Sequence, residues 1–353
     1  MKGIYFQEGR ATYREDLPMP VPAENESLIR ILYTGICNTD REILKGYRPN
    51  FRGVMGHEFV GIVEMSSDPY WIGRRVVGEL NAGCGHCIYC RTGREKHCPE
   101  RKVIGMDGKD GCFAEYMTLA THLLHEVPDG LPLKQALLTE PLAAALEIPQ
   151  QVHIFPDMAV AIIGDGRLAY LIASVLHLEG AELTIIGKHP DKLARFADFG
   201  KTRLLKQMYG DRFQAQTNGR KDLESTNSEQ ISQGQTSQEQ EAFEVVVEAS
   251  GSPSGLKLAS GLVRRQGIIV LKSTYAGTVE VDMSQFVVNE ITIKGSRCGP
   301  FLPALRLLEK RLVKLPAAEF YELKDWENAF ASEAFKAGFV LEEEGNRSLM
   351  QSF

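Results

Sequence analysis

Four cysteines lie close together in the chain with a spacing that suits a metal site. Cys84, Cys87, Cys90 and Cys98 form the pattern CxxCxxCx7C. Two-residue gaps let successive thiolates converge on one ion, and four sulfurs fill a tetrahedral shell with no position open to substrate. The spacing therefore predicts a structural zinc lobe over residues 84–98, with an iron–sulfur cluster as the alternative. His86 and His97 are expected to be surface residues.

A second set of candidate ligands is spread along the chain. It consists of Cys37 in GICNTD, His57 and Glu58 in GHEFVG, and Glu140 in TEPLAA. Together they supply one thiolate, one imidazole and one or two carboxylates, which is the mixed set of a catalytic zinc that keeps an exchangeable position. Each residue alone has an ordinary structural explanation, so the prediction depends on their combination.

A third pattern, GDGRLA, follows directly after the apolar run 158–163. Gly164 allows a tight turn, Gly166 lets the backbone approach a pyrophosphate, and Ala169 allows close packing of helix on strand. The helix N-terminus would then face the phosphates. This strand, turn and helix predict a dinucleotide site.

The elements that would position these residues fall into two kinds. Residues 1–147 contain short β-branched runs at 28–33, 59–64 and 75–77, separated by turns, which predict a β-rich domain of antiparallel strands. From 158 onward, apolar strands (158–163, 182–186, 202–205, 243–248, 267–271 and 291–294) alternate with helical patterns at 167–179 and 190–199. Such alternation predicts an α/β domain with a doubly wound parallel sheet over 148–296.

Two segments lie outside this alternation. Residues 214–240 include seven Gln and only three apolar residues, a composition that predicts a disordered surface insertion. Residues 297–353 contain a helical pattern at 303–310 and are expected to return to the first domain, with 349–353 as a strand.

Composition limits the class of protein. The 353 residues carry a net charge of -6, which disfavours a nucleic-acid partner. No apolar run approaches the length of about 20 residues that a membrane helix needs. The first ten residues lack a signal-peptide pattern, and an odd number of cysteines, seven, suits a reducing compartment. We therefore expect a cytoplasmic protein.

The order of the motifs GICNTD, GHEFVG, the four-cysteine lobe, DGCFAEY, EPLA and GDGRLA resembles the zinc-containing medium-chain dehydrogenase family of the alcohol dehydrogenase superfamily. Within it, the threonine, sorbitol and glucose dehydrogenase branch is the most similar. The resemblance covers nearly the whole chain except the insertion. It implies a GroES-like catalytic domain, a Rossmann cofactor domain, and a homodimer or homotetramer.

The resemblance also implies roles for single residues. Cys37 and His57 would be zinc ligands, and either Glu58 or Glu140 would supply the carboxylate. Thr39 would bind the substrate oxygen, and Asp40 would orient the histidine ligand. The implied activity is a zinc-dependent, NAD(P)-dependent dehydrogenase of alcohols, polyols or sugars with two zinc ions per chain. A non-catalytic zinc- and dinucleotide-binding sensor is the alternative.

The choice of nicotinamide cofactor depends on the residues after the second strand of the α/β domain. NAD-binding folds place an acid there, roughly 20 residues beyond the glycines. This chain has Gly187, which leaves room for a 2′-phosphate, and Lys188 and His189 follow as partners for its charge. The pattern predicts NADP(H) over NAD(H). Asp165, inside the glycine motif, is expected to add negative charge near the phosphates.

Overall fold

The computed structural model describes residues 1–209, 242–274 and 278–342. Its internal contacts divide the chain into two units, one of Met1–Glu147 with the segment from Cys298, the other of Ile148–Arg297. The boundaries expected from the sequence were 147 and 296. The insertion 214–240 and the expected strand 349–353 lie outside the described residues. Among the described helices, none has both the length and the apolar character needed to cross a membrane.

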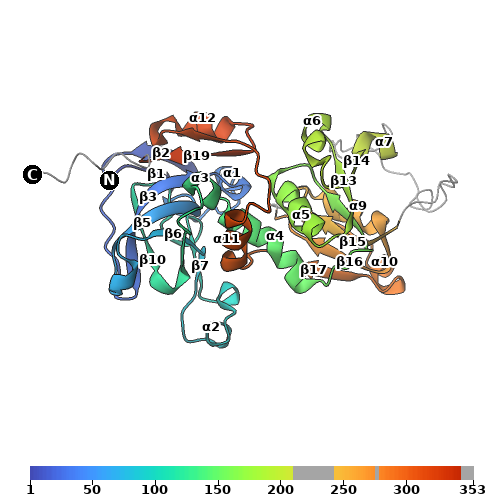
Figure 1. The fold of residues 1–353 in the computed structure, drawn as a ribbon, viewed down its shortest axis with the longest axis horizontal. Helices are drawn as coiled ribbons and strands as arrows, with labels where there is room; N and C mark the ends of the chain where they lie inside the picture. Colours follow the sequence, from blue (N-terminus) through green and yellow to red (C-terminus); the bar gives the residue numbers. More distant parts are fainter. Residues whose placement is uncertain (210–241, 275–277, 343–353) are drawn as a thin grey trace, which may run out of the picture. The chain divides into compact units, whose positions relative to one another are not determined.

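The unit Ile148–Arg297 is built on one six-stranded parallel sheet (Figure 1). Its strands are β12 (Ala159–Ile163), β13 (Glu182–Gly187), β14 (Lys201–Leu204), β15 (Phe243–Glu248), β16 (Val263–Leu271) and β17 (Thr292–Gly295). Their order is β14-β13-β12-β15-β16-β17, and every neighbouring pair is parallel. This order is that of the dinucleotide-binding doubly wound fold, so the predicted Rossmann fold is confirmed.

Helices pack against this sheet. Helix α5 (Arg167–Leu178) contacts β12 and β13, and α9 (Ser254–Leu262) contacts β15 and β16. The other α-helices among the described residues that begin in this unit are α6 (Pro190–Leu193), α7 (Leu205–Tyr209) and α10 (Met283–Val288). The helix expected over 190–199 is wrong in length, because the chain tightens into a 3-10 turn at Ala194–Phe196 that buries Phe196.

The described residues of the other unit form three sheets, and the largest, of seven strands, has β3 (Glu26–Gly35) in its interior. Strand β3 pairs with β5 (Glu58–Met65), β10 (Tyr116–Ala120) and β19 (Lys336–Val340). The remaining strands are β1 (Gly3–Gln7), β2 (Arg10–Arg14), β4 (Gly53–Val54), β6 (Arg75–Gly78), β7 (Asn81–Ala82), β8 (Lys102–Ile104), β9 (Gly108–Lys109), β11 (Leu124–Glu126) and β18 (Ala318–Tyr321). Their described pairings are antiparallel except β8 with β9 and β18 with β19.

The described helices that begin in this unit are α1 (Asn38–Leu44), α2 (Ile88–Arg91), α3 (Leu133–Ala136), α4 (Thr139–Gln151), α11 (Phe301–Glu309) and α12 (Trp326–Ala331). Helix α4 extends past Glu147 into the other unit. The C-terminal segment returns to this unit through β18 and β19, earlier in the chain than the strand expected at 349–353. Strand β19 joins β3 because its apolar residues Ala337 and Phe339 are fully buried in the core.

Candidate metal and dinucleotide sites

The four cysteines of the predicted zinc lobe converge in the structure. The sulfur atoms of Cys84, Cys87, Cys90 and Cys98 all lie within 4.8 Å of one another. Helix α2 carries Cys90, and Cys87 is the residue before its first turn, so their sulfurs lie 3.5 Å apart. Gly83 permits the close approach, since a Cβ there would lie 2.6 Å from the Cys90 sulfur. Figure 1 shows the loop around α2 extending from the sheets of its unit.

The electrostatics of this lobe fit a cation. The backbone N–H groups of His86 and Cys87 lower the pKa of Cys84 to about 6, so this sulfur is a thiolate near neutral pH. Removal from water and the neighbouring sulfurs raise the pKa of Cys90. Four adjacent thiolates would repel one another, and a divalent cation would relieve that repulsion. The donor set therefore fits zinc, and His86 and His97 lie exposed beside it.

Three of the four dispersed candidates also come together. One ligand atom each from Cys37, His57 and Glu58 lies within 4.8 Å of the others. Cys37 precedes α1 directly after β3, and Glu58 begins β5, where it pairs in register with Gly35 at the end of β3. The pairing of these two strands thus produces the cluster. Glu140, in the first turn of α4, is not part of this cluster of described residues.

Asp40 lies behind this cluster. Its side chain is fully buried, with Oδ1 3.4 Å from His57 Nδ1, while Oδ2 accepts a hydrogen bond of 2.8 Å from the Cys37 backbone N–H. Burial lowers the pKa of His57, but Asp40 and Cys37 raise it well above its ordinary value. With Nδ1 facing Asp40, Nε2 is the ring nitrogen that would bind a metal. Thr39 Oγ1 lies 3.8 Å from the Cys37 sulfur.

Lys336 is a member of this site that the sequence analysis missed. It is 3% exposed, and its ammonium forms a salt bridge with the carboxylate of Glu58, which is 1% exposed. It also donates to the Ile36 carbonyl at 3.3 Å. Gly35 leaves room for this pair, because a Cβ there would lie 2.5 Å from the Lys336 side chain. A single charge inside the apolar run AFKAGFV is the sequence signal that could have identified it.

The glycine motif has the geometry that its sequence predicts. Gly164 has φ of +129°, and a Cβ there would lie 2.6 Å from the Ala249 carbonyl oxygen. Gly166 precedes the first turn of α5 and has no described atom within 4 Å of a Cβ position. Ala169 is fully buried. The backbone is thus open at Gly166, at the start of a long helix, where a pyrophosphate could approach.

The end of β13 differs from the sequence expectation. A Cβ on Gly187 would lie 2.7 Å from both Cβ and Oδ2 of Asp165, so the space expected for a 2′-phosphate contains the Asp165 side chain. Asp165 Oδ2 accepts hydrogen bonds from the backbone N–H groups of Lys188 and His189, at 2.7 and 2.8 Å. The expectation of open room at Gly187 is therefore wrong. These hydrogen bonds hold the Asp165 carboxylate at the end of β13.

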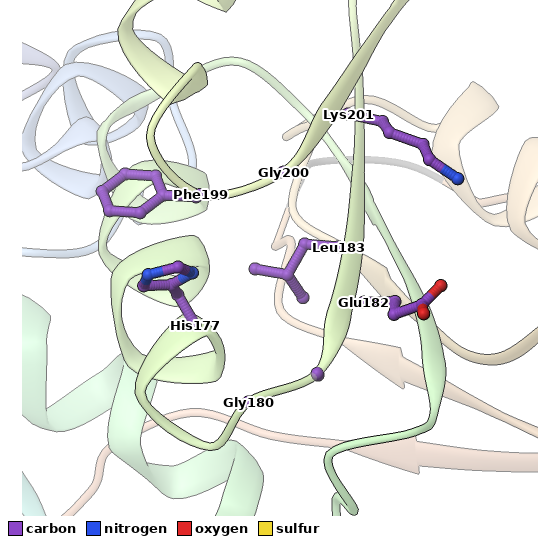
Figure 2. Close-up of a pocket in the computed structure, with 8 residues that line it drawn as sticks. His177, Gly180, Glu182, Leu183, Phe199, Gly200 and Lys201 are labelled. Carbon is purple, nitrogen blue, oxygen red and sulfur yellow. The ribbon is translucent and has the colours of Figure 1, made fainter.

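A separate hollow of about 420 Å³ lies at the other end of the same strands. Its lining includes His177, Phe199, and the starts of β13 and β14 at Glu182 and Lys201. Figure 2 shows the charged ends of Glu182 and Lys201 directed away from the two rings. Ligands of doubly wound sheets bind at the carboxyl ends of the strands, so this hollow is not the dinucleotide site.

Comparisons with known proteins agree with this architecture. The family model of the alcohol dehydrogenase GroES-like domain matches residues 23–129. A sorbitol dehydrogenase of Halalkalibacterium halodurans is 29% identical over 92% of each chain. An L-threonine 3-dehydrogenase of Xanthomonas campestris is 26% identical over 98% of this chain and 97% of its own.

The fold is also that of a solved structure. The alcohol dehydrogenase from Thermus sp. ATN1 is 23% identical and superimposes with a TM-score of 0.79, covering 96% of this chain and 99% of its own. The chain therefore contains an alcohol dehydrogenase GroES-like domain and a parallel sheet in the order of the Rossmann fold. Over nearly its whole length it is similar to sorbitol and threonine dehydrogenases of the medium-chain dehydrogenase/reductase family.

Proposed function

We propose that this protein is a zinc-dependent oxidoreductase that transfers a hydride between a nicotinamide dinucleotide and the carbon of an alcohol, polyol or sugar. The observation that supports it most is the cluster of Cys37, His57 and Glu58, with Asp40 buried behind it. A non-catalytic sensor has no need of such a mixed ligand set, whereas a catalytic zinc requires an exchangeable position. The related proteins are named as dehydrogenases of polyols and hydroxy amino acids.

Each residue of the cluster has a role in this proposal. Cys37, His57 and Glu58 hold the catalytic zinc, which when bound lowers the pKa of an alcohol oxygen. The Asp40 carboxylate, 3.4 Å from His57 Nδ1, would orient the ring so that Nε2 is available to the metal. Lys336 fixes one oxygen of Glu58 and offsets its buried charge. Glu140, in α4, is the alternative to Glu58 as carboxylate ligand and would have to approach the zinc from that helix.

Thr39 is the residue that we assign to the substrate proton. Its hydroxyl lies beside the Cys37 sulfur, at 3.8 Å, and can both accept and donate a hydrogen bond. It would accept the hydrogen bond of the substrate hydroxyl and pass the proton outward as the hydride leaves the carbon. The four-cysteine lobe holds the second, structural zinc.

The dinucleotide would bind at the carboxyl ends of β12 and β13. Gly164, Gly166 and Ala169 form the turn that receives the pyrophosphate at the start of α5. The end of β13, with Gly187, Lys188 and His189, faces the adenosine ribose.

A substrate screen tests the activity. Alcohols, polyols, sugars and hydroxy amino acids are offered with NAD or NADP, and the absorbance of the reduced nicotinamide is followed. A substrate-dependent rise that disappears in His57→Ala supports the proposal. Binding of dinucleotide with no turnover of any of these compounds would favour the sensor alternative.

We also propose that the protein assembles as a homodimer or homotetramer in the cytoplasm. Among the described strands, β17 is an edge of the parallel sheet, and an edge strand can pair with another chain. Beside it, Val287 and Val288 of α10 are 74% and 78% exposed, and Met283 and Ile293 are also exposed. An apolar surface next to a sheet edge is typical of an interface between subunits.

A further inference from the structure

We propose that Asp165 takes the part of the acid missing at Gly187 and makes the protein selective for NAD(H) over NADP(H). This inference rests on the dinucleotide site proposed above. It reverses the preference expected from Gly187, Lys188 and His189 in the sequence. The acid comes from the glycine turn and not from the end of the second strand.

The Asp165 carboxylate lies at the end of β13, beside Gly187. Asp165 lies between Gly164 and Gly166, yet its side chain extends across to the end of β13 and fills the space beside Gly187. Its Oδ2 accepts the N–H groups of Lys188 and His189 and lies 3.0 Å from His189 Nδ1. The carboxylate therefore occupies the place where doubly wound folds hold the adenosine ribose.

The contacts of Asp165 involve one of its two carboxylate oxygens. The three contacts all use Oδ2, and the side chain is 12% exposed. Among the described residues, these contacts leave Oδ1 to accept a ribose hydroxyl. Two backbone donors and the narrow space fix the orientation of the carboxylate, so it is preorganised to accept a hydrogen bond.

The same contacts exclude a 2′-phosphate. The backbone N–H groups of Lys188 and His189, at the end of β13, already donate to Asp165. A phosphate there would also lie against a carboxylate of the same sign in a partly buried site. Lys188, an exposed side chain, cannot compensate while the carboxylate stays in place.

The test measures binding of the adenosine half alone, without catalysis. Isothermal titration calorimetry compares ADP-ribose with 2′-phospho-ADP-ribose in the native protein, in Asp165→Asn and in Asp165→Ala. The control is Asp191→Asn, which removes an exposed carboxylate from the first turn of α6 and changes the net charge equally. Thermal unfolding of each variant shows whether it is folded.

We expect the native protein and Asp191→Asn to bind ADP-ribose more tightly by about tenfold or more, a difference of about 1.4 kcal/mol. Both Asp165 variants should lose most of that ratio. Equal affinities in the native protein, a preference for the phosphorylated compound, or an unchanged ratio in folded Asp165→Asn would overturn the assignment. If the Asp165 variants do not fold, the native ratio alone decides. Failure of the native protein to bind either compound would instead contradict the proposed dinucleotide site itself.

Discussion

Buried charges at the candidate zinc site come in mutually dependent pairs. Lys336 and Glu58 are buried together, and Asp40 is buried against His57. A charge that is buried away from water is stable only beside an opposite charge. Removing one member of a pair therefore leaves the other buried without a partner. The ligands of this site therefore depend on residues that do not themselves contact the metal.

Replacing Lys336 with Met should lower the free energy of unfolding by about 3 to 5 kcal/mol, because the Glu58 carboxylate is left buried without a partner. Denaturant unfolding of metal-free protein measures this change. The control is Lys324→Met, since Lys324 forms a solvent-exposed pair with Glu322 and its loss should leave stability nearly unchanged. A loss of similar size in both variants would contradict the part given to Lys336.

Replacing Cys98 with Ser should remove the structural zinc and reduce stability and solubility. Cys98 is fully buried among the four sulfurs, and a structural zinc site contributes directly to the free energy of folding. Cys298→Ser is the matched control, since Cys298 lies outside the sulfur cluster and accepts from Asn81 at 3.3 Å. Metal analysis and thermal unfolding compare the two. Unchanged zinc content in Cys98→Ser would disprove the assignment of the lobe.

At the scale of elements, the turn between β12 and α5 offers two glycines with separable roles. Gly164 needs its glycine for the fold, because φ is +129° and a Cβ would meet the Ala249 carbonyl oxygen. Gly166 has open space around it. Gly164→Ala should therefore lower the unfolding temperature. Gly166→Ala should leave the unfolding temperature unchanged but weaken dinucleotide binding.

Calorimetric binding of NADH and thermal unfolding distinguish these two effects. Gly130→Ala is the control, because no described atom lies within 4 Å of a Cβ position at Gly130 and this residue belongs to the other unit. If Gly166→Ala binds NADH as tightly as the native protein, the pyrophosphate does not approach this backbone.

The sequence pattern was enough to predict the parallel sheet. The buried strands of the unit Ile148–Arg297 are runs rich in β-branched residues, and glycines mark turns between elements. Residue types and motifs were enough to propose both sets of metal ligands, the four cysteines and the mixed set around Cys37, since metal chemistry restricts the kinds of ligand. The sequence could not show that Asp165 reaches the end of β13. That contact is set by the side-by-side pairing of β12 with β13, which brings together residues far apart in the chain.

Lys336 was missed for a related reason. Its partner Glu58 lies far away in the sequence, and only the pairing of β19 with β3, and of β3 with β5, brings the two side chains together. The choice between Glu58 and Glu140 was open for the same reason. Both motifs contain an acid, but the strand register places Glu58 with Cys37 and His57.

At the scale of the whole molecule, we expect subunits to associate through the edge of the parallel sheet at β17. Replacing Val288 with Glu should shift the protein toward monomers, because a charge would be buried in the apolar contact beside β17. The control is Val21→Glu, since Val21 is 86% exposed in the other unit. Light scattering after size-exclusion chromatography measures the mass. An unchanged mass in Val288→Glu would place the interface elsewhere.

The zinc content of the purified chain tests the central claim most directly. The four-sulfur set and the set of Cys37, His57 and Glu58 are separate clusters and cannot share an ion. We predict two zinc ions per chain in the native protein by elemental analysis, and one in a folded but inactive His57→Ala variant. One zinc ion or none in the native protein, or an unchanged content in His57→Ala, would contradict the account.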